Sequence, residues 1–250
     1  MSYYNQNKYK SVSYPHASRP NATVASSGCG VCCMSMIVEG LTGQAWPPKQ
    51  SAAYSISVGA RASSGTDMAR LGAQISKKFS LPYKTTSDVN MLAEALKGGA
   101  WAIANVGGDR TGYTGLFSDA GHYIVVRGIW GGKFIIWDPG YYVGKFNKAG
   151  RNGKVTISGN DIYVLPLYLD QDCSSRAPRY YIFEEDNMIT QDQFDKMMDN
   201  YLAARDKLPA SSWAKGIFTQ AKTEGITDGS APRGLVTKEE AAAMIMRAQK

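Results

Sequence analysis

A nearly continuous apolar run from Cys29 to Gly43 constrains the fold of this chain more than any other feature. Such a run predicts a helix that is buried on most sides. The glycines at positions 40 and 43 are expected to end it, because glycine commonly terminates helices. Cys29 would then lie at the N-terminus of a helix that the rest of the chain must cover.

Helical patterns precede strand patterns in the first two thirds of the chain. Further helices are predicted at 66–75 and 88–97, each opened by a residue of the capping type. Short apolar segments bounded by Gly, Asp or Pro then predict strands at 101–106, 123–129, 133–137 and 162–167. Helices followed by antiparallel strands indicate an α+β fold.

The chain changes character after an acidic break at 184–186. Three helical patterns follow, near 190–206, 211–224 and 237–249, the last opened by a candidate capping box of Thr237 and Glu240. We therefore predict one domain over residues 1–184 and a small all-α module over 187–250. A module of about sixty residues makes a weak core, so it is expected to lean on the first domain or on a partner.

The formal charge of +7 divides unevenly between these parts. Residues 1–186 carry 19 Lys and Arg against 13 Asp and Glu, whereas 187–250 carry 9 against 8. An anionic polymer such as a cell wall fits this charge as well as nucleic acid does, and without a dense basic run nucleic-acid binding is not expected. No segment is long enough to insert stably in a membrane, and the first residues lack the apolar part of a secretory signal. We expect a protein made in the cytoplasm.

Cys29 and His122 are the candidate nucleophile and general base. A free thiol is mostly protonated near neutral pH, and the partial positive charge of a helix N-terminus favours the thiolate. Gly28 and Gly30 would let a substrate approach the backbone closely. His16 lies in a polar stretch, whereas His122 opens the most apolar predicted strand and is the stronger candidate. The alternative for His122 is a purely structural role at the edge of a sheet.

Asp138 ends the next predicted strand and is the candidate for orienting His122. A two-residue turn would place Val125 opposite Asp138 and turn His122 to the other face of the sheet. A three-residue loop at 130–132 would pair Ile124 with Asp138 and bring His122 diagonally beside it. We predict the three-residue loop. The alternative role for Asp138 is that of a residue that caps the turn before Pro139-Gly140.

Three segments in this order resemble the papain-like C39-type cysteine peptidases: Ser27-Gly-Cys-Gly30, Gly121-His-Tyr-Ile-Val-Val126 and Trp137-Asp-Pro-Gly140. The resemblance spans roughly residues 3–170. It implies a helix bearing the cysteine packed on an antiparallel sheet bearing His and Asp, with no cofactor or metal. It also implies that Gln6, in Tyr4-Asn-Gln6, supports the oxyanion beside the backbone N–H of Cys29.

Cys29-Gly-Val-Cys32 leaves a redox interpretation open, because C-x-x-C pairs carry out thiol–disulfide exchange. Thioredoxin-like modules place this pair directly after an apolar strand, whereas the residues before it here are mostly polar. A zinc site would need a second ligand pair at a recognisable spacing. Cys32, Cys33 and Cys173 are most simply core or surface residues of a reduced chain.

The tail resembles the surface-layer-homology-like segments of phage endolysins and autolysins, through residues 212–229 and 235–244. Both resemblances together imply an endolysin-like hydrolase that cuts an amide bond in the peptide part of peptidoglycan through Cys29, His122 and Asp138. The tail would bind a wall polymer, merely stabilise the enzyme, or form a dimer. The enzyme would reach the wall through a membrane pore or after lysis.

Two other functions stay open. A peptidase that processes proteins or leader peptides would use the same four residues on another amide bond, although such enzymes are usually joined to a membrane transporter. A wall-binding adaptor would keep its cysteine for structure alone. The loss of activity on Cys29→Ala would separate a hydrolase from the adaptor.

Overall fold

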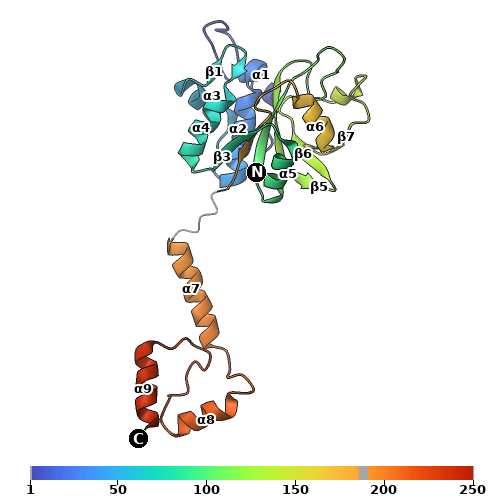
Figure 1. Ribbon diagram of the computed structural model, residues 1–250. Coiled ribbons are helices and arrows are strands. Elements are labelled where there is room, and N and C mark those ends of the chain that lie inside the picture. Colours follow the sequence, from blue (N-terminus) through green and yellow to red (C-terminus); the bar gives the residue numbers. More distant parts are fainter. Residues whose placement is uncertain (1, 186–190, 250) are drawn as a thin grey trace. The chain divides into compact units, whose positions relative to one another are not determined.

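The structure is a computed structural model that describes residues 2–185 and 191–249 (Figure 1). By its internal contacts the chain separates into two compact units, Met1–Asp186 and Asn187–Lys250. Helices of the first unit are η1 (Gln6–Lys8), α1 (Val24–Ser27), α2 (Cys29–Thr42), α3 (Pro48–Ser57), α4 (Met68–Phe79), α5 (Val89–Lys97), η2 (Lys145–Asn147) and α6 (Pro166–Cys173). Its strands are β1 (Arg61–Ala62), β2 (Gly65–Thr66), β3 (Tyr83–Thr86), β4 (Trp101–Val106), β5 (His122–Trp130), β6 (Lys133–Trp137), β7 (Val155–Ser158), β8 (Asp161–Val164) and β9 (Tyr180–Phe183).

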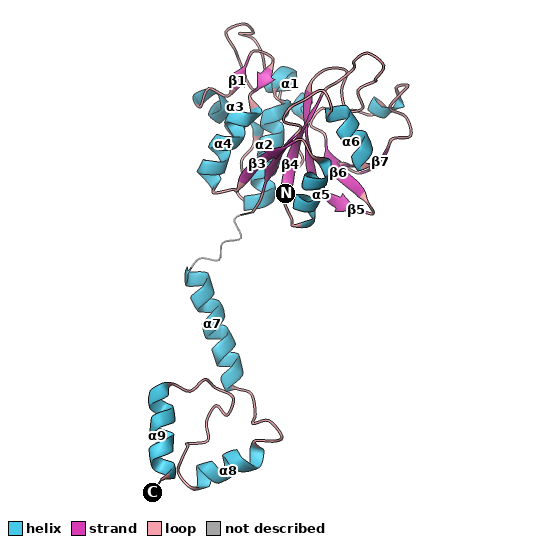
Figure 2. Ribbon diagram, viewed as in Figure 1, coloured by secondary structure: helices cyan, strands magenta, loops and turns pink. Residues whose placement is uncertain are grey.

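A seven-stranded antiparallel sheet in the order β3-β9-β4-β5-β6-β8-β7 forms the middle of the first unit (Figure 2). Alternation along the strands divides the core in two. Val125 and Ile103 pack with α2 and α4 on one face, whereas Ile124 and Val126 pack with α5 and α6 on the other. Helices and an antiparallel sheet were expected, and the mixed architecture confirms that part of the prediction.

Helix α2 is the buried helix that the apolar run predicts. Ten of its fourteen residues are buried, and it ends at Gly43, which has the left-handed conformation of a C-cap (φ 69°). Gly40, however, does not end the helix. A Cβ at Gly40 would lie 2.6 Å from the ring of Trp101, so this glycine gives β4 room to pack against α2.

The strand predictions need several corrections. The segment 162–167 is a strand only to Val164, because Pro166 lies in the first turn of α6. Proline is tolerated there, since a backbone N–H in the first turn has no hydrogen-bond partner within the helix. The helix predicted at 66–75 begins at Met68 and is capped by Asp67, while Thr66 belongs to β2. Strand β9, between β3 and β4 in the sheet, has no counterpart in the prediction.

The β5–β6 hairpin differs from the predicted three-residue loop. Trp130 pairs with Lys133 across a two-residue turn, Gly131-Gly132, and both glycines have positive φ. A β-bulge between Val126 and Gly128 then shifts the register by one residue, so Val125 pairs with Trp137. Strand β6 ends at Trp137, and the same register continued by one residue would place Ile124 opposite Asp138, as the three-residue loop was expected to do.

The bulge is held by side chains of a third strand. Arg127, the extra residue, donates from Nε and Nη2 to the carboxylate of Asp161 at 3.0 and 2.6 Å. Trp137 donates its indole N–H to the same carboxylate at 2.7 Å. Asp161 begins β8, so a residue from outside the hairpin stabilises its register.

The second unit contains α7 (Gln191–Asp206), α8 (Lys215–Thr223) and α9 (Lys238–Ala248). Thr237 and Glu240 form the predicted capping box, with Thr237 Oγ1 accepting from the N–H of Glu240 at 3.1 Å. Where side chains of 191–249 are described, none is buried. None of the described helices in either unit is long and apolar enough to cross a membrane.

Candidate active site

Cys29 is the first residue of α2 and is partly exposed. The flanking glycines face protein: a Cβ at Gly28 would lie 2.6 Å from Val24, and one at Gly30 would lie 2.7 Å from Thr66. They are thus required for close packing of α1 and β2 against the start of α2, not for the approach of a substrate as the sequence suggested. This packing fixes the backbone on both sides of the thiol.

His122 is the first residue of β5, and its side chain is 9% exposed. Its Nε2 lies 2.8 Å from Oδ1 of Asp138. His122 and Cys29 also act on each other's pKa, lowering that of the thiol and raising that of the imidazole, so the two side chains lie close together. The structure therefore brings together Cys29, His122 and Asp138 in the order that the sequence interpretation requires.

Asp138 is fully buried and accepts three hydrogen bonds through its carboxylate. Oδ1 accepts from His122 and from the backbone N–H of Gly140 at 2.8 Å, and Oδ2 accepts from Nζ of Lys145 at 2.6 Å. Lys145 is itself 5% exposed. Sequence inspection missed Lys145, because a lysine seven residues after an aspartate in a turn-rich segment carries no distinguishing pattern.

Gly140 also lies against the imidazole. A Cβ at this position would be 3.0 Å from Cε1 and Nε2 of His122. Any larger residue would push the ring away from Asp138. The Pro139-Gly140 pair that was expected to end β6 therefore also makes room for the His122 ring.

Gln6 joins the two halves of the site. Its backbone N–H donates to the carbonyl of Pro139 at 2.8 Å, and its Nε2 donates to the carbonyl of Ala25, in α1, at 2.9 Å. Gln6 therefore lies between the turn that follows Asp138 and the helix that leads into Cys29. Only one of its two amide N–H groups is used in these bonds, and its Oε1 is buried without a partner among the described residues.

Charges at the site favour an ion pair between sulfur and imidazole. Burial raises the pKa of the Cys29 thiol, but the hydrogen bond and charge of His122 and the N–H groups of Tyr123 and Gly30 lower it below its ordinary value. Burial lowers the pKa of His122, but Asp138 and Cys29 outweigh it and raise it to about 9. The imidazolium and the thiolate therefore stabilise each other.

Asp138 stays ionised despite its burial. Burial raises its pKa, while the charge of Lys145 and the hydrogen bond from His122 lower it to about 2. The carboxylate therefore carries its negative charge at neutral pH. It can hold the imidazole in one orientation and stabilise its protonated form.

The remaining cysteines and His16 lie outside this arrangement. His16 is bonded to Ser18 in an N-terminal turn. All four cysteines are free, Cys32 and Cys33 are fully buried in α2, and burial raises the pKa of both thiols. A thiol so disfavoured as a thiolate is a poor partner for disulfide exchange. Within 2–185 and 191–249, no cluster of His, Cys, Asp and Glu could hold a metal ion.

The chain is similar in sequence to a peptidase family and in fold to solved structures. Residues 1–152 match the sequence profile of the Peptidase_C39 like family. Among solved structures, a protein from Bacillus anthracis provisionally described as a C39-like peptidase is similar over 63% of this chain and 88% of its own, with 14% identity and a TM-score of 0.44. No curated protein matches the chain.

Proposed function

The chain belongs to the Peptidase_C39 like family, which makes it a cysteine peptidase, and we propose that its substrate is the peptide part of the bacterial cell wall. The observation that carries the catalytic part is the chain of contacts from Cys29 through His122 to Asp138. In the proposed reaction Cys29 is the nucleophile, His122 the general base and acid, and Asp138 the group that orients the imidazole.

The reaction proceeds by acyl transfer. The Cys29 thiolate attacks the amide carbon and forms a C–S bond, and the carbonyl oxygen becomes an oxyanion. His122 gives its proton to the leaving nitrogen, and the C–N bond breaks to release an amine. Water then attacks the thioester while His122 takes its proton, and the C–S bond breaks to release a carboxylic acid.

Gln6 and the backbone N–H of Cys29 stabilise the oxyanion in this mechanism. The position of Gln6 between Ala25 and Pro139 supports this role, because Pro139 follows Asp138 and Ala25 lies in α1, the helix just before Cys29. Its free amide N–H is the donor available for the oxyanion. Removing one such donor typically lowers kcat about 100-fold or more.

The cell wall is favoured as substrate by the second unit. A concave pocket of about 700 Å³ is lined by aromatic and basic side chains, among them Tyr201, Trp213, Arg205 and Arg233. Aromatic rings stack on sugar rings, and guanidinium groups bind carboxylates and phosphates. We propose that this pocket binds an anionic wall polymer, which places the enzyme at the wall, where its basic first unit is also attracted.

Clearing of purified Gram-positive cell walls tests the catalytic proposal. The native chain should clear the walls and release fragments with new peptide termini in mass spectrometry, and Cys29→Ala should do neither. Cys32→Ala is the matched control, since it removes the other cysteine of the C-x-x-C pair and should leave clearing intact. Equal loss in both variants would favour the redox interpretation, and no clearing by any protein would favour a protein-processing peptidase or an adaptor.

Binding of the wall polymer is tested separately in the Cys29→Ala background, so that the walls stay intact. Trp213→Ala should reduce the fraction of protein that sediments with walls. Trp130→Ala is the control, because Trp130 is similarly exposed, at 70% against 80%, but lies in the catalytic unit. Unchanged sedimentation of Trp213→Ala would contradict the proposed pocket.

A further inference from the structure

Arg176 lies beside the catalytic histidine, in the segment between α6 and β9. Its Nη2 occupies the space next to Gly121, where a Cβ would come within 2.4 Å of it. Gly121 immediately precedes His122 in the chain. The guanidinium therefore lies beside the residue that directly precedes the start of β5.

This guanidinium has almost no partners of its own. Three other arginines of the unit, Arg127, Arg151 and Arg179, each bind an aspartate at 2.6 to 2.8 Å. Arg176 makes only a 3.5 Å contact from Nη2 to the carbonyl of Gly107, and its Nε is buried without a partner among the described residues. A buried N–H donor without an acceptor costs free energy. An anion that binds there would remove this cost.

Two tyrosines lie near Arg176 and the candidate catalytic histidine. The rings of Tyr123, in β5, and Tyr181, in β9, meet edge-on with their centroids 6.2 Å apart. Burial raises the pKa of both phenols, and the charge of Arg176 acts on both in the opposite direction. Tyr123 directly follows His122 in β5. The guanidinium beside Gly121 and the two phenols thus lie in one small region next to the candidate catalytic histidine.

We propose that Arg176 binds a free carboxylate of the peptide substrate, close to the amide bond that Cys29 attacks. The proposal rests on the peptidase function above and specifies its substrate. A guanidinium forms paired, charge-assisted hydrogen bonds with a carboxylate, and its unbonded donors are available for them. A carboxamide at the same place would lose the charge and one of the two acceptors.

Two synthetic wall stem peptides test this role, identical except for a carboxylate or a carboxamide beside the cleaved bond. The native enzyme should cleave the carboxylate peptide with at least about tenfold higher kcat/KM, mainly through a lower KM. Arg176→Gln should lose this preference and cleave the two peptides with similar kcat/KM. Arg176→Lys should retain part of it. Arg19→Gln is the charge-matched control, because Arg19 is exposed and its side chain makes no hydrogen bond with any described residue.

The outcomes separate this proposal from the one it rests on. Equal cleavage of both peptides by the native enzyme would overturn the role of Arg176 and leave the peptidase function standing. A preference that survives Arg176→Gln would overturn it as well. If the native enzyme cleaves neither peptide and clears no walls, the wall-peptidase function itself fails.

An independent observation concerns α7. Phe194, Met197, Met198 and Tyr201 are spaced three and four residues apart, so they lie on one face of the helix, and all are exposed by 38% or more. No side chain described in the second unit is buried. Helices whose described side chains are all at least partly exposed gain too little from burial to offset the loss of chain entropy when they fold.

Methionine and phenylalanine side chains of this kind pack against protein, whereas a polar wall polymer would leave them hydrated. The second unit is also nearly neutral, with 9 basic and 8 acidic residues, so two copies do not repel each other. An apolar stripe on one helix is complementary to the same stripe on a second copy related by a twofold axis. We infer that a second copy of this chain covers the face formed by Phe194, Met197 and Met198, which adjoins the pocket that Tyr201 lines.

Sedimentation equilibrium of the full chain tests this inference. The mass should rise with concentration from the 27.2 kDa of one chain to twice that value. Met197→Lys should remain monomeric and lose helix signal in circular dichroism, with activity on a small peptide unchanged. Ala203→Lys adds the same charge on the opposite side of α7 and should still dimerise. A native chain that is monomeric throughout, or a Met197→Lys variant that still dimerises, would overturn the inference.

Discussion

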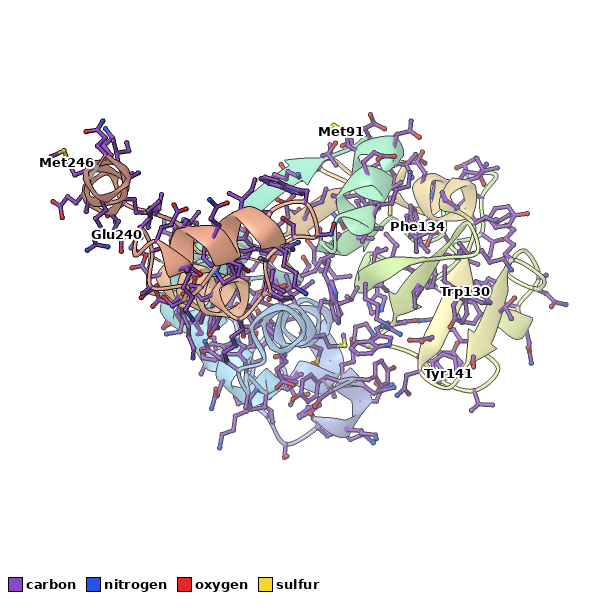
Figure 3. All side chains as sticks on the ribbon, turned by 90° about the horizontal axis from the view of Figure 1, so that it is seen from below. Met91, Trp130, Phe134, Tyr141, Glu240 and Met246 are labelled. Carbon is purple, nitrogen blue, oxygen red and sulfur yellow. The ribbon has the colours of Figure 1, made fainter. Side chains whose placement is uncertain are left out.

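Ten of the fourteen residues of α2 are buried, whereas α8 and α9 contain no buried residue. The first unit encloses α2 between a sheet and other helices, and even charged groups such as Asp138 and Lys145 are buried there with partners. The second unit holds its helices by local bonds, such as the Thr237 capping box and the side-chain bond of Gln220 to Glu224. Figure 3 shows α9 end-on with side chains, Met246 among them, spreading outward.

The difference shows what each unit can do by itself. A catalytic site needs side chains held in fixed rotamers, and tight packing provides that. A unit without a core has helices set by local sequence, and it must obtain rigidity from whatever it binds. Catalysis therefore belongs to the first unit, and interaction is the role that suits the second.

The largest expected effect tests the buried ion pair of the first unit. Lys145→Met should lower the free energy of unfolding by about 3 to 5 kcal/mol, because it leaves the carboxylate of Asp138 buried with one cation fewer. Urea unfolding followed by tryptophan fluorescence measures it. Asp138→Asn combined with Lys145→Met should cost less than the two single changes added together; simple additivity would mean that the pair is not coupled.

A matched pair of leucines compares the two units directly. Leu71→Ala, at a fully buried position of α4, should cost about 2 to 5 kcal/mol, and Leu235→Ala, 63% exposed in the second unit, less than about 0.5 kcal/mol at a concentration where the chain is monomeric. Both are measured by urea unfolding. A large effect of Leu235→Ala would show that the second unit has a core after all.

The response to pH should also differ between the units. The raised pKa of His122 stabilises the first unit fully below the ordinary value of 6.5, and this contribution is lost as the pH rises through about 9. The lowered pKa of Asp138 contributes above its ordinary 3.8, by about 2 kcal/mol, and is lost as the pH falls through about 2. In the second unit Asp228 and Glu240 are exposed carboxyls with lowered pKa values. They therefore change the stability of that unit only at acid pH.

Thermal unfolding between pH 6 and 10 checks this difference. Near-UV circular dichroism of the first unit should show a melting temperature that falls toward pH 9, and His122→Gln should flatten that dependence. The ion pair of Cys29 and His122 should also determine how activity depends on pH. The acid limb of kcat/KM should lie below the ordinary thiol pKa, and the alkaline limb should lie near 9. An alkaline limb near 6.5 would contradict the ion pair.

The smallest expected effect concerns the capping box of α9. Thr237→Ala removes the side-chain acceptor for the N–H of Glu240 and should cost about 1 kcal/mol of helix stability. Far-UV circular dichroism of the full chain should show reduced helix content, with activity on a small peptide unchanged. Thr223→Ala is the control, since its hydroxyl bonds the carbonyl of Thr219 within α8 and caps no helix start.

Local features were the ones that the sequence predicted well. The boundaries of α2, the Asp88 cap of α5 and the capping box of α9 depend on residues within one turn of each other. The candidate residues Cys29 and His122 could be singled out because each begins a strongly apolar element. That these two side chains lie close together was inferred from the family resemblance and from the position of Asp138 at the end of the next predicted strand.

Features that depend on distant residues were missed. The bulge at Arg127 is held by Asp161, which lies 34 residues further along the chain, and nothing within the hairpin itself reveals it. Lys145 reaches Asp138 only because η2 folds back over the turn. Strand β9 was missed because its partners, β3 and β4, are some 80 to 100 residues earlier in the sequence.

The bulge also divides the β5–β6 hairpin into two parts with different tolerance for change. On the site side, the pairing of Val125 with Trp137 sets the positions of His122 and Asp138, and Asp161 fixes it through Arg127. On the far side, the Gly131-Gly132 turn touches neither catalytic residue. That turn is therefore a position where a reporter dye or an affinity tag could be inserted into a working enzyme.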